Sequence, residues 1–194
     1  RGTTNQPVPV EVPPPAAGLN WKSVSVGFEH TCAIASNDRA YCWGRNDQGQ
    51  LGDGTTTDRS TPTSVVGVTA LRQISAGYDY TCAVDNDGAG WCWGTFGGMA
   101  TDQSKRQAVL TPARAFDGYV LESIQASRTE VCGNVRSTGI VCWGVQSLRA
   151  SGSYQVFRAY QESTVPLVVF SGDISSYASS SDRKCAIFRT GIMQ

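Results

Sequence analysis

The sequence predicts an all-β protein, specifically a β-propeller of four-stranded antiparallel blades. Three observations carry this prediction: a segment with two cysteines occurs three times, its copies lie 50 residues apart, and short runs of β-branched and aromatic residues alternate with turn formers. Repeats of about 40 to 50 residues, each with some four short strands, are typical of propeller blades. No helix of ordinary length is expected.

The repeated segment reads TCAIASNDRAYCWG at 31–44, TCAVDNDGAGWCWG at 81–94 and VCGNVRSTGIVCWG at 131–144. Each copy has two cysteines ten positions apart, with Trp-Gly directly after the second. Turn-forming residues such as Asn37 and Asp38 stand between the cysteines, and strand-forming residues flank them. This arrangement predicts a β-hairpin in each copy.

The cysteine spacing predicts cross-strand disulfides. An antiparallel hairpin that reverses midway between two such cysteines places them opposite each other, within disulfide reach. Three bonds are therefore predicted, each stabilising the fold by about 2 to 3 kcal/mol on the chain-entropy model: Cys32 with Cys42, Cys82 with Cys92, and Cys132 with Cys142. Buried free thiols would not explain why six of the seven cysteines fall in register. Metal ligands are normally separated by about two to four residues, so no metal is expected.

Composition limits the kinds of partner that the protein can bind and indicates where it is located. Sixteen basic and sixteen acidic residues give a net charge of zero, so no attraction to nucleic acid is expected. The longest apolar run, 165–170, is far shorter than the ~18 residues needed to cross a bilayer, and no membrane insertion is expected. Disulfides persist in oxidising compartments, which predicts a secreted, extracellular protein whose signal segment was removed or lies upstream of Arg1.

The period also predicts how the chain is divided. Repeats begin at Trp21, Leu71 and Leu121, and a fourth begins near Ile174, each eleven residues before a cysteine. The expected units are 1–20, an edge strand of a preceding blade or a Pro-rich arm; 21–70, 71–120 and 121–173, three blade repeats; and 174–194, the start of a fourth. The edge-strand alternative rests on the alternating Pro and Val between positions 7 and 12.

The first repeat carries the most specific motifs. Its stretches GFEHTCAI at 27–34, CWGRN at 42–46 and GQLG at 49–52 resemble the repeat of the regulator of chromosome condensation family, in a secreted, cysteine-bearing form. The second repeat lacks GQLG, and the third keeps little beyond its cysteines and the following Trp-Gly. The resemblance implies a propeller with commonly seven blades, which needs about 350 residues at this repeat length. We therefore expect an incomplete ring of about three complete blades plus partial blades at both ends.

The seventh cysteine, Cys185, would find its hairpin partner one residue beyond Gln194. It is expected to be unpaired or to have its partner outside the chain. Three alternatives stay open: the chain is a slice of a longer protein, it is complete and pairs open sheet edges with other copies, or Cys185 forms an intermolecular bridge. Open edges favour association with other protein chains or with further copies, up to an extracellular fibre.

The sequence contains no catalytic constellation, so an enzyme is not expected, and no cofactor is implied. The single histidine, His30, is replaced by other polar residues in the later repeats, which favours a hydrogen-bonding role between blades. Asp53 and Asp58 could form an acid pair, but they lie in a Gly/Thr-rich loop without aromatic walls or a base. We expect them to be solvated loop charges.

Aromatic and hydroxyl-bearing residues supply the other candidate sites. Trp43, Trp93 and Trp143 recur in register after the second cysteine, and we expect them to pack between blades. Trp91 is off that register and is a candidate contact for a sugar or a protein ligand. The candidate glycosylation sites are Thr55, Thr56, Thr57, Pro13, Pro14 and Pro15.

These observations predict an extracellular, non-enzymatic structural or interaction module of disulfide-stapled propeller repeats, either a slice of a longer protein or a subunit of an extracellular assembly. The alternative is a propeller that binds a carbohydrate or a protein ligand, which predicts aromatic side chains gathered at one loop face. A hydrolase or inhibitor-binding propeller predicts instead acidic residues that converge on the central channel.

Overall fold

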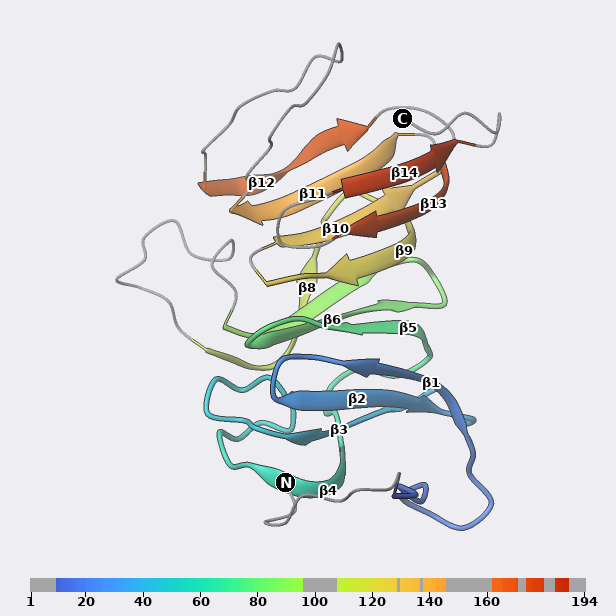
Figure 1. Ribbon diagram of the computed structural model, residues 1–194, viewed down its shortest axis with the longest axis vertical. Helices are drawn as coiled ribbons and strands as arrows, with labels where there is room; N and C mark the ends of the chain where they lie inside the picture. The colour runs from blue at the N-terminus through green and yellow to red at the C-terminus, as the bar shows by residue number, and fades with distance from the viewer. Residues whose placement is uncertain are drawn as a thin grey trace.

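The computed structural model describes residues 10–95, 108–128, 130–136, 138–145, 162–170, 174–179 and 184–188. Every helix or strand assigned within these ranges is a β-strand, and none of their residues forms a helix that could span a membrane. The strands form separate antiparallel sheets that follow one another in chain order along the long axis of the molecule (Figure 1). The all-β class predicted from the sequence is confirmed.

Each sheet is a meander, because strands that are neighbours in sequence are also neighbours in the sheet. The first sheet contains β1 (Trp21–Val26), β2 (His30–Ala35), β3 (Ala40–Gly44) and β4 (Arg59–Ser64). The second contains β5 (Leu71–Ala76), β6 (Tyr80–Asp85), β7 (Gly90–Gly94) and β8 (Val109–Ala115). The third contains β9 (Leu121–Ala126), β10 (Glu130–Val135), β11 (Gly139–Val145) and β12 (Glu162–Phe170). The described part of the fourth contains β13 (Ile174–Ser179) and β14 (Lys184–Phe188).

The three hairpins have the register that the cysteine spacing predicts. Each cysteine of β2, β6 and β10 stands directly opposite the cysteine of the following strand. The structure joins them as disulfides, Cys32 to Cys42, Cys82 to Cys92 and Cys132 to Cys142, with Cα atoms 4.1, 4.1 and 4.0 Å apart. Each bond therefore pins the two central strands of a four-stranded sheet.

The glycines that follow Trp43 and Trp93 are required by a close approach of two backbones. A Cβ on Gly44 would lie 2.5 Å from the carbonyl oxygen of Glu29, and a Cβ on Gly94 would lie 2.5 Å from that of Asp79. Both glycines also have positive φ, 108° and 94°, which other residues rarely adopt. The Trp-Gly pair of the first and second repeats thus marks where the hairpin packs against its own entry loop.

The sheets pack face to face through two apolar layers. The layer between the first and second sheets includes Ile34, Leu51, Leu71, Ile74 and Trp93, all buried. The layer between the second and third sheets is built in the same way and includes Val84, Phe116, Ile124, Val131 and Val141. Both faces of the second sheet are therefore covered, as in a propeller blade between two neighbours.

Hydrogen bonds from side chain to backbone connect consecutive sheets at a constant spacing of 51 residues. The amide of Ala76 donates to the hydroxyl of Ser25 at 2.9 Å, and the amide of Ala126 donates to the hydroxyl of Ser75 at 2.9 Å. Gln73 bonds both the amide and the carbonyl of Ile124, at 2.8 and 3.1 Å. Each sheet is thus held to the next by side chains of its first strand.

The segment before β1 forms no strand over its described part, residues 10–20. It contacts the first sheet through the indole nitrogen of Trp21, which donates to the carbonyl of Val12 at 2.9 Å, and through the amide of Asn20, which donates to the hydroxyl of Ser36 at 3.3 Å. By contrast, 59–64 and 109–115 before the later repeats are strands, and the choice between an edge strand and an arm for 1–20 stays a prediction. The edge-strand prediction for positions 7–9 lies outside the described residues.

Candidate functional site

The antiparallel topology gives the stacked sheets two loop faces. The long-loop face carries the β1–β2 and β5–β6 loops, 27–29 and 77–79, and the β3–β4 connection, 45–58. The short-turn face carries the hairpin turns at 36–39 and 86–89 and the links between sheets at 65–70 and 116–120. These segments are loops at the ends of the strands, and loops carry the side chains that most often contact a ligand.

A buried polar relay joins the first two sheets below the long-loop face. The Nε2 atom of His30 lies 2.8 Å from the hydroxyl of Thr81, and that hydroxyl donates to the carbonyl of Gln50 at 2.8 Å. The indole nitrogen of Trp93 donates to the same carbonyl at 2.9 Å. Since the Thr81 hydroxyl gives its proton to Gln50, it accepts the Nε2–H of a neutral His30. Burial lowers the pKa of His30 to about 4, which keeps the imidazole neutral.

The GQLG motif of the first repeat positions this relay. A Cβ on Gly52 would lie 2.7 Å from the indole nitrogen of Trp93, so only glycine permits this approach. Leu51 and Gln50 are both buried, at 0% and 1% exposure. The motif therefore packs the β3–β4 connection of the first sheet against the tryptophan of the second.

The same position in the second interface is occupied by a different group. The hydroxyl of Tyr80, which stands where His30 does in the first repeat, donates to the carbonyl of Glu130 at 2.5 Å and accepts from the amide of Ser127 at 3.1 Å. Burial raises the pKa of Tyr80 well above its usual range, so the hydroxyl stays protonated. His30 and Tyr80 are therefore equivalent connectors between sheets, and neither has the exposure that a catalytic base needs.

The β3–β4 connection is folded around Asn46, which is fully buried. Its amide nitrogen donates to the carboxylate of Asp53 at 3.1 Å and to the carbonyls of Thr55 and Thr57 at 3.0 and 3.1 Å, while its backbone amide donates to Asp58 at 2.7 Å. The expectation that Asp53 is a solvated loop charge was wrong. Its side chain is 3% exposed and pairs with Arg59 at 2.8 Å, because the loop closes over it.

Four charged side chains gather on the long-loop face, and we call them the Arg45 cluster. The guanidinium of Arg45 lies 3.1 Å from Glu29, 2.6 Å from Asp47 and 3.6 Å from Asp79. One positive group thus faces three carboxylates. Burial, together with the negative charges of Asp47 and Glu29, raises the pKa of Asp79 although Arg45 opposes the shift. A pocket of about 410 Å³ opens beside the cluster.

Next to the cluster, three side chains at equivalent repeat positions form what we call the aromatic row: Phe28, Tyr78 and Arg128. The rings of Phe28 and Tyr78 are stacked, with centroids 4.2 Å apart and planes at 18°. The guanidinium carbon of Arg128 lies 4.9 Å from the centre of the Tyr78 ring. Phe28 ends the row and is 59% exposed.

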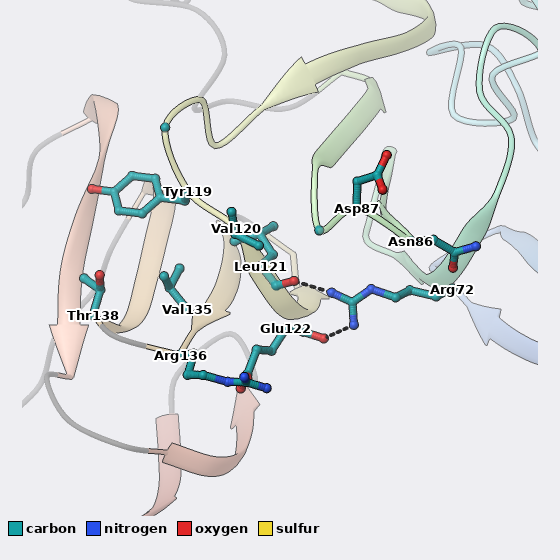
Figure 2. A pocket seen from close by; sticks show the side chains of 12 residues that line it. Arg72, Asn86, Asp87, Tyr119, Val120, Leu121, Glu122, Val135, Arg136 and Thr138 are labelled. Carbon is teal, nitrogen blue, oxygen red and sulfur yellow. Dashed lines mark hydrogen bonds and ion pairs between the residues drawn. The ribbon is translucent and has the colours of Figure 1, made fainter.

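The short-turn face has a pocket of about 570 Å³ between the second and third sheets. Figure 2 shows the guanidinium of Arg72 reaching from the second sheet to the backbone carbonyls of Leu121 and Glu122. On the far wall, Arg136 pairs with the carboxylate of Glu122 at 2.6 Å. Arg72 already holds the second sheet to the third, so the pocket is best described as a groove between blades.

The first sheet has an exposed apolar face, which we call the open face. Its members Val24 and Val26 are 64% and 71% exposed. The residue equivalent to Val24 in the second sheet, Ile74, is 6% exposed because the first sheet covers it, and Ala76, the equivalent of Val26, is 8% exposed. In the described part of the chain, the first sheet thus lacks the neighbour that every later sheet has on this side.

The structure places the predicted tryptophans in different environments. Trp93 is fully buried between the first two sheets, whereas Trp43 is half-buried, with its ring 5.9 Å from that of Trp21. Trp143 is half-buried, and its ring lies 6.0 Å from that of Phe116 in an edge-on arrangement. Trp91 donates to the carboxylate of Asp85 at 2.8 Å and has the guanidinium of Arg114 5.0 Å above its ring, so one of its faces is already occupied.

The other predicted sites are partly within reach of solvent. Thr56, Thr57, Pro13 and Pro15 are exposed, and Pro14 is half-buried. The hydroxyl of Thr55 is engaged, because it donates to Asp53 at 2.7 Å.

Cys185 lies in β14 opposite Ala178 of β13. The glycosylation of these residues and the pairing of Cys185 stay predictions. Among the described residues no group of three or more His, Cys, Asp or Glu side chains could hold a metal ion.

Four-stranded meanders that pack face to face in sequence order, each with its two central strands joined, define the chain as a segment of a β-propeller. Residues 21–50 and 37–84 match models of the Regulator of chromosome condensation (RCC1) repeat. Residues 21–84 are therefore similar to RCC1 repeats, and the chain has the fold of a β-propeller segment.

Known proteins agree with this assignment. The E3 ubiquitin-protein ligase HERC2 of Homo sapiens is 42% identical over 64 residues, 31% of this chain and 1% of that protein. Among solved structures, yeast RCC1 (Prp20) bound to Kap60 has a TM-score of 0.75 with 19% identity over 97% of this chain. The CRINKLY WD40 ectodomain of the Arabidopsis thaliana receptor kinase ACR4 has a TM-score of 0.51 with 19% identity over 91% of this chain. This chain spans 46% and 49% of those two chains.

Proposed function

We propose that the chain is a non-enzymatic interaction module of the extracellular space, which binds other protein chains or further copies of itself through the open face of its first sheet. The observation that carries this proposal is the exposure of Val24 and Val26, whose equivalents in the second sheet, Ile74 and Ala76, are buried. Exposed apolar surface with buried equivalents elsewhere in the same molecule is typical of an interaction site.

The location outside the cytoplasm is supported by the three disulfides, since such bonds persist in oxidising compartments. The similarity of the fold to a receptor kinase ectodomain supports that location. Binding of a protein is supported by the fold as well, because yeast RCC1 is solved in complex with the protein Kap60. The proposal includes a role as a subunit of an extracellular assembly.

Binding of a carbohydrate has less support. The aromatic side chain proposed for it, Trp91, donates its indole hydrogen to Asp85 and lies under the guanidinium of Arg114. Stacking on a sugar needs a free aromatic face. Catalysis also has less support, because His30 and Asp53 are held in buried structural contacts.

The test is the association of the intact, oxidised chain in solution, measured by sedimentation velocity over a range of concentrations. We expect the wild type to associate and Val26→Glu to be monomeric, because the charge would be buried in the contact. Val120→Glu is the matched control: Val120 is 68% exposed but lies on the short-turn face. A wild type that is monomeric throughout contradicts self-association, and equal behaviour of the two variants contradicts the assignment of the open face.

A further inference from the structure

Asp-Gly pairs are places where a protein chain can rearrange without an enzyme. The backbone amide nitrogen of the glycine can attack the side-chain carboxyl carbon of the aspartate, because glycine has no Cβ to hinder the approach. The chain contains three such pairs, at 53–54, 87–88 and 117–118. The structure holds the three pairs in different environments, so we expect them to differ in reactivity.

The first pair, Asp53 and Gly54, has both of its reacting groups engaged. The Asp53 carboxylate is 3% exposed and accepts hydrogen bonds from Asn46 at 3.1 Å and from Arg59 at 2.8 Å. The amide of Gly54 donates to the carbonyl of Leu110 at 3.0 Å. This pair is therefore protected on both sides of the reaction.

The second pair is protected at its glycine. Asp87 is exposed, but Gly88 is buried, and its amide donates to the carbonyl of Asp85 at 3.0 Å. The carbonyl of Gly88 accepts from the amide of Leu121 at 2.8 Å, and a Cβ on Gly88 would lie 2.6 Å from a methyl carbon of Val120. The backbone of this pair is thus fixed by the hairpin turn and by the third sheet.

The third pair, Asp117 and Gly118, has neither restraint. Both residues are exposed, and within the described ranges no hydrogen bond or ion pair engages the Asp117 carboxylate or the Gly118 amide. A Cβ on Gly118 would meet no atom within 4 Å. The turn around the pair is closed by the amide of Tyr119, which donates to the carbonyl of Phe116 at 3.0 Å. Since Phe116 is held at a φ of 60°, which is strained for a residue with a side chain, opening of this turn relieves strain.

We propose that Asp117 is a site of spontaneous isomerisation to isoaspartate. The Gly118 nitrogen bonds to the side-chain carboxyl carbon of Asp117, and the carboxyl hydroxyl leaves as water with the proton of the amide, which gives a five-membered succinimide. Water then adds to the ring and breaks the bond between its nitrogen and the former backbone carbonyl carbon, which becomes a carboxylate. The chain now runs through the Asp117 Cβ, with unchanged mass and net charge. The proposal goes beyond the proposed function and requires neither a partner nor association.

The modification would act on the link between the second and third sheets, residues 116–120. Phe116 and Leu121 stand at the two ends of this link and are 2% and 1% exposed in the apolar layer between these sheets. Isomerisation adds one methylene group to the backbone of a link whose ends are fixed. We therefore expect it to loosen the interface between the second and third sheets.

The experiment incubates the intact, oxidised protein at neutral pH and body temperature for several weeks and then quantifies isoaspartate in tryptic peptides. Cleavage after arginine and lysine separates the three pairs into the peptides 46–59, 73–105 and 115–128. Aspartate and isoaspartate peptides have equal mass, and chromatography with electron-transfer fragmentation distinguishes them. We expect isoaspartate to accumulate about tenfold faster in 115–128 than in the other two peptides, because their glycine amides must first break a hydrogen bond.

Controls assign the difference to the folded structure. In the reduced protein in denaturant, the three pairs should convert at similar rates, because the protection of the first two is lost. Asp117→Glu should abolish conversion in 115–128, since the larger ring closes far more slowly, and Asp87→Glu should leave that conversion unchanged. Incubation should lower the thermal unfolding temperature of the wild type and leave that of Asp117→Glu unaltered.

Two results overturn the inference: conversion in 115–128 that is no faster than in 73–105 while the protein is folded, or conversion that occurs only after denaturation. Conversion of Asp117 without a change in the unfolding temperature supports the modification site and contradicts the loosening of the interface.

Discussion

The interface between the first and second sheets and the interface between the second and third are built on one plan but with different polar groups. In both, a serine hydroxyl accepts the backbone amide 51 residues ahead, at 2.9 Å. Only the first has the relay of His30, Thr81 and the Gln50 carbonyl, whereas the second uses the Tyr80 hydroxyl on the backbone of the third sheet. The shared contacts fix how sheets stack, and the varied ones can change as long as the buried polar atoms are satisfied.

The largest expected effect comes from the tryptophan that the first interface encloses. Trp93→Ala should destabilise the protein by about 3 to 5 kcal/mol, because it opens a cavity beneath the GQLG loop and leaves the Gln50 carbonyl with one donor fewer. Trp43→Ala, at the same repeat position but half-buried on the uncovered side, should cost less than half as much. Chemical denaturation of both variants measures the difference. An equal decrease in the free energy of unfolding for both variants would show that the contact between sheets does not stabilise the tryptophan at this position.

His30 allows the first interface to be weakened by pH alone. The pKa of this residue falls from 6.5 to about 4 in the folded protein, so the unfolded chain binds more protons between these values and the free energy of unfolding decreases as pH is lowered. The loss should approach about 3 kcal/mol near pH 4. The loss disappears as pH rises above 6.5, where the imidazole becomes neutral in the unfolded chain as well.

Denaturation of the wild type at several pH values should show this slope, and His30→Gln should abolish it. The assignment is direct because the chain has one histidine. A slope that persists in His30→Gln would assign the effect to carboxylates and contradict the burial of a neutral imidazole.

The second interface should be sensitive to a single oxygen atom. Tyr80→Phe removes the donor to the Glu130 carbonyl and the acceptor for the Ser127 amide, and it should cost about 1 to 3 kcal/mol. It should not alter the slope of stability between pH 4 and 6.5, which belongs to the first interface. Tyr41→Phe is the control, since the Tyr41 hydroxyl has an exposed contact to Asn37 at 3.3 Å, and its effect should be about 0.5 kcal/mol or less. Equal effects of the two changes would contradict a connecting role for Tyr80.

The cysteine register was enough to predict the hairpins, since two cysteines ten apart can face each other only if the strands between them pair in one way. The contacts between sheets could not be predicted in the same way. Their acceptors and donors are largely backbone atoms, such as the Ile124 carbonyl or the Gln50 carbonyl, and these leave no mark in the sequence.

Two features of the long-loop face were missed for related reasons. Asp53 was expected to be solvated because its neighbours are Gly and Thr, yet those residues let the loop fold around Asn46 and bury the carboxylate. The aromatic row joins residues 50 apart whose types differ, so no motif marks it, although equivalent positions in the repeat alignment could have revealed it. Association through open strand edges stays a prediction, and the exposed valines lie on the face of the first sheet.

The hydroxyls of Ser25 and Ser75 each accept a hydrogen bond from a backbone amide, a group that every residue except proline has. The receiving strand is therefore free to drift in sequence without breaking the connection, and the third repeat, which retains hardly any of the first repeat's motifs, still stacks in register. Whole repeats can therefore be duplicated, lost or exchanged while the hydrogen bonds between neighbouring sheets stay the same.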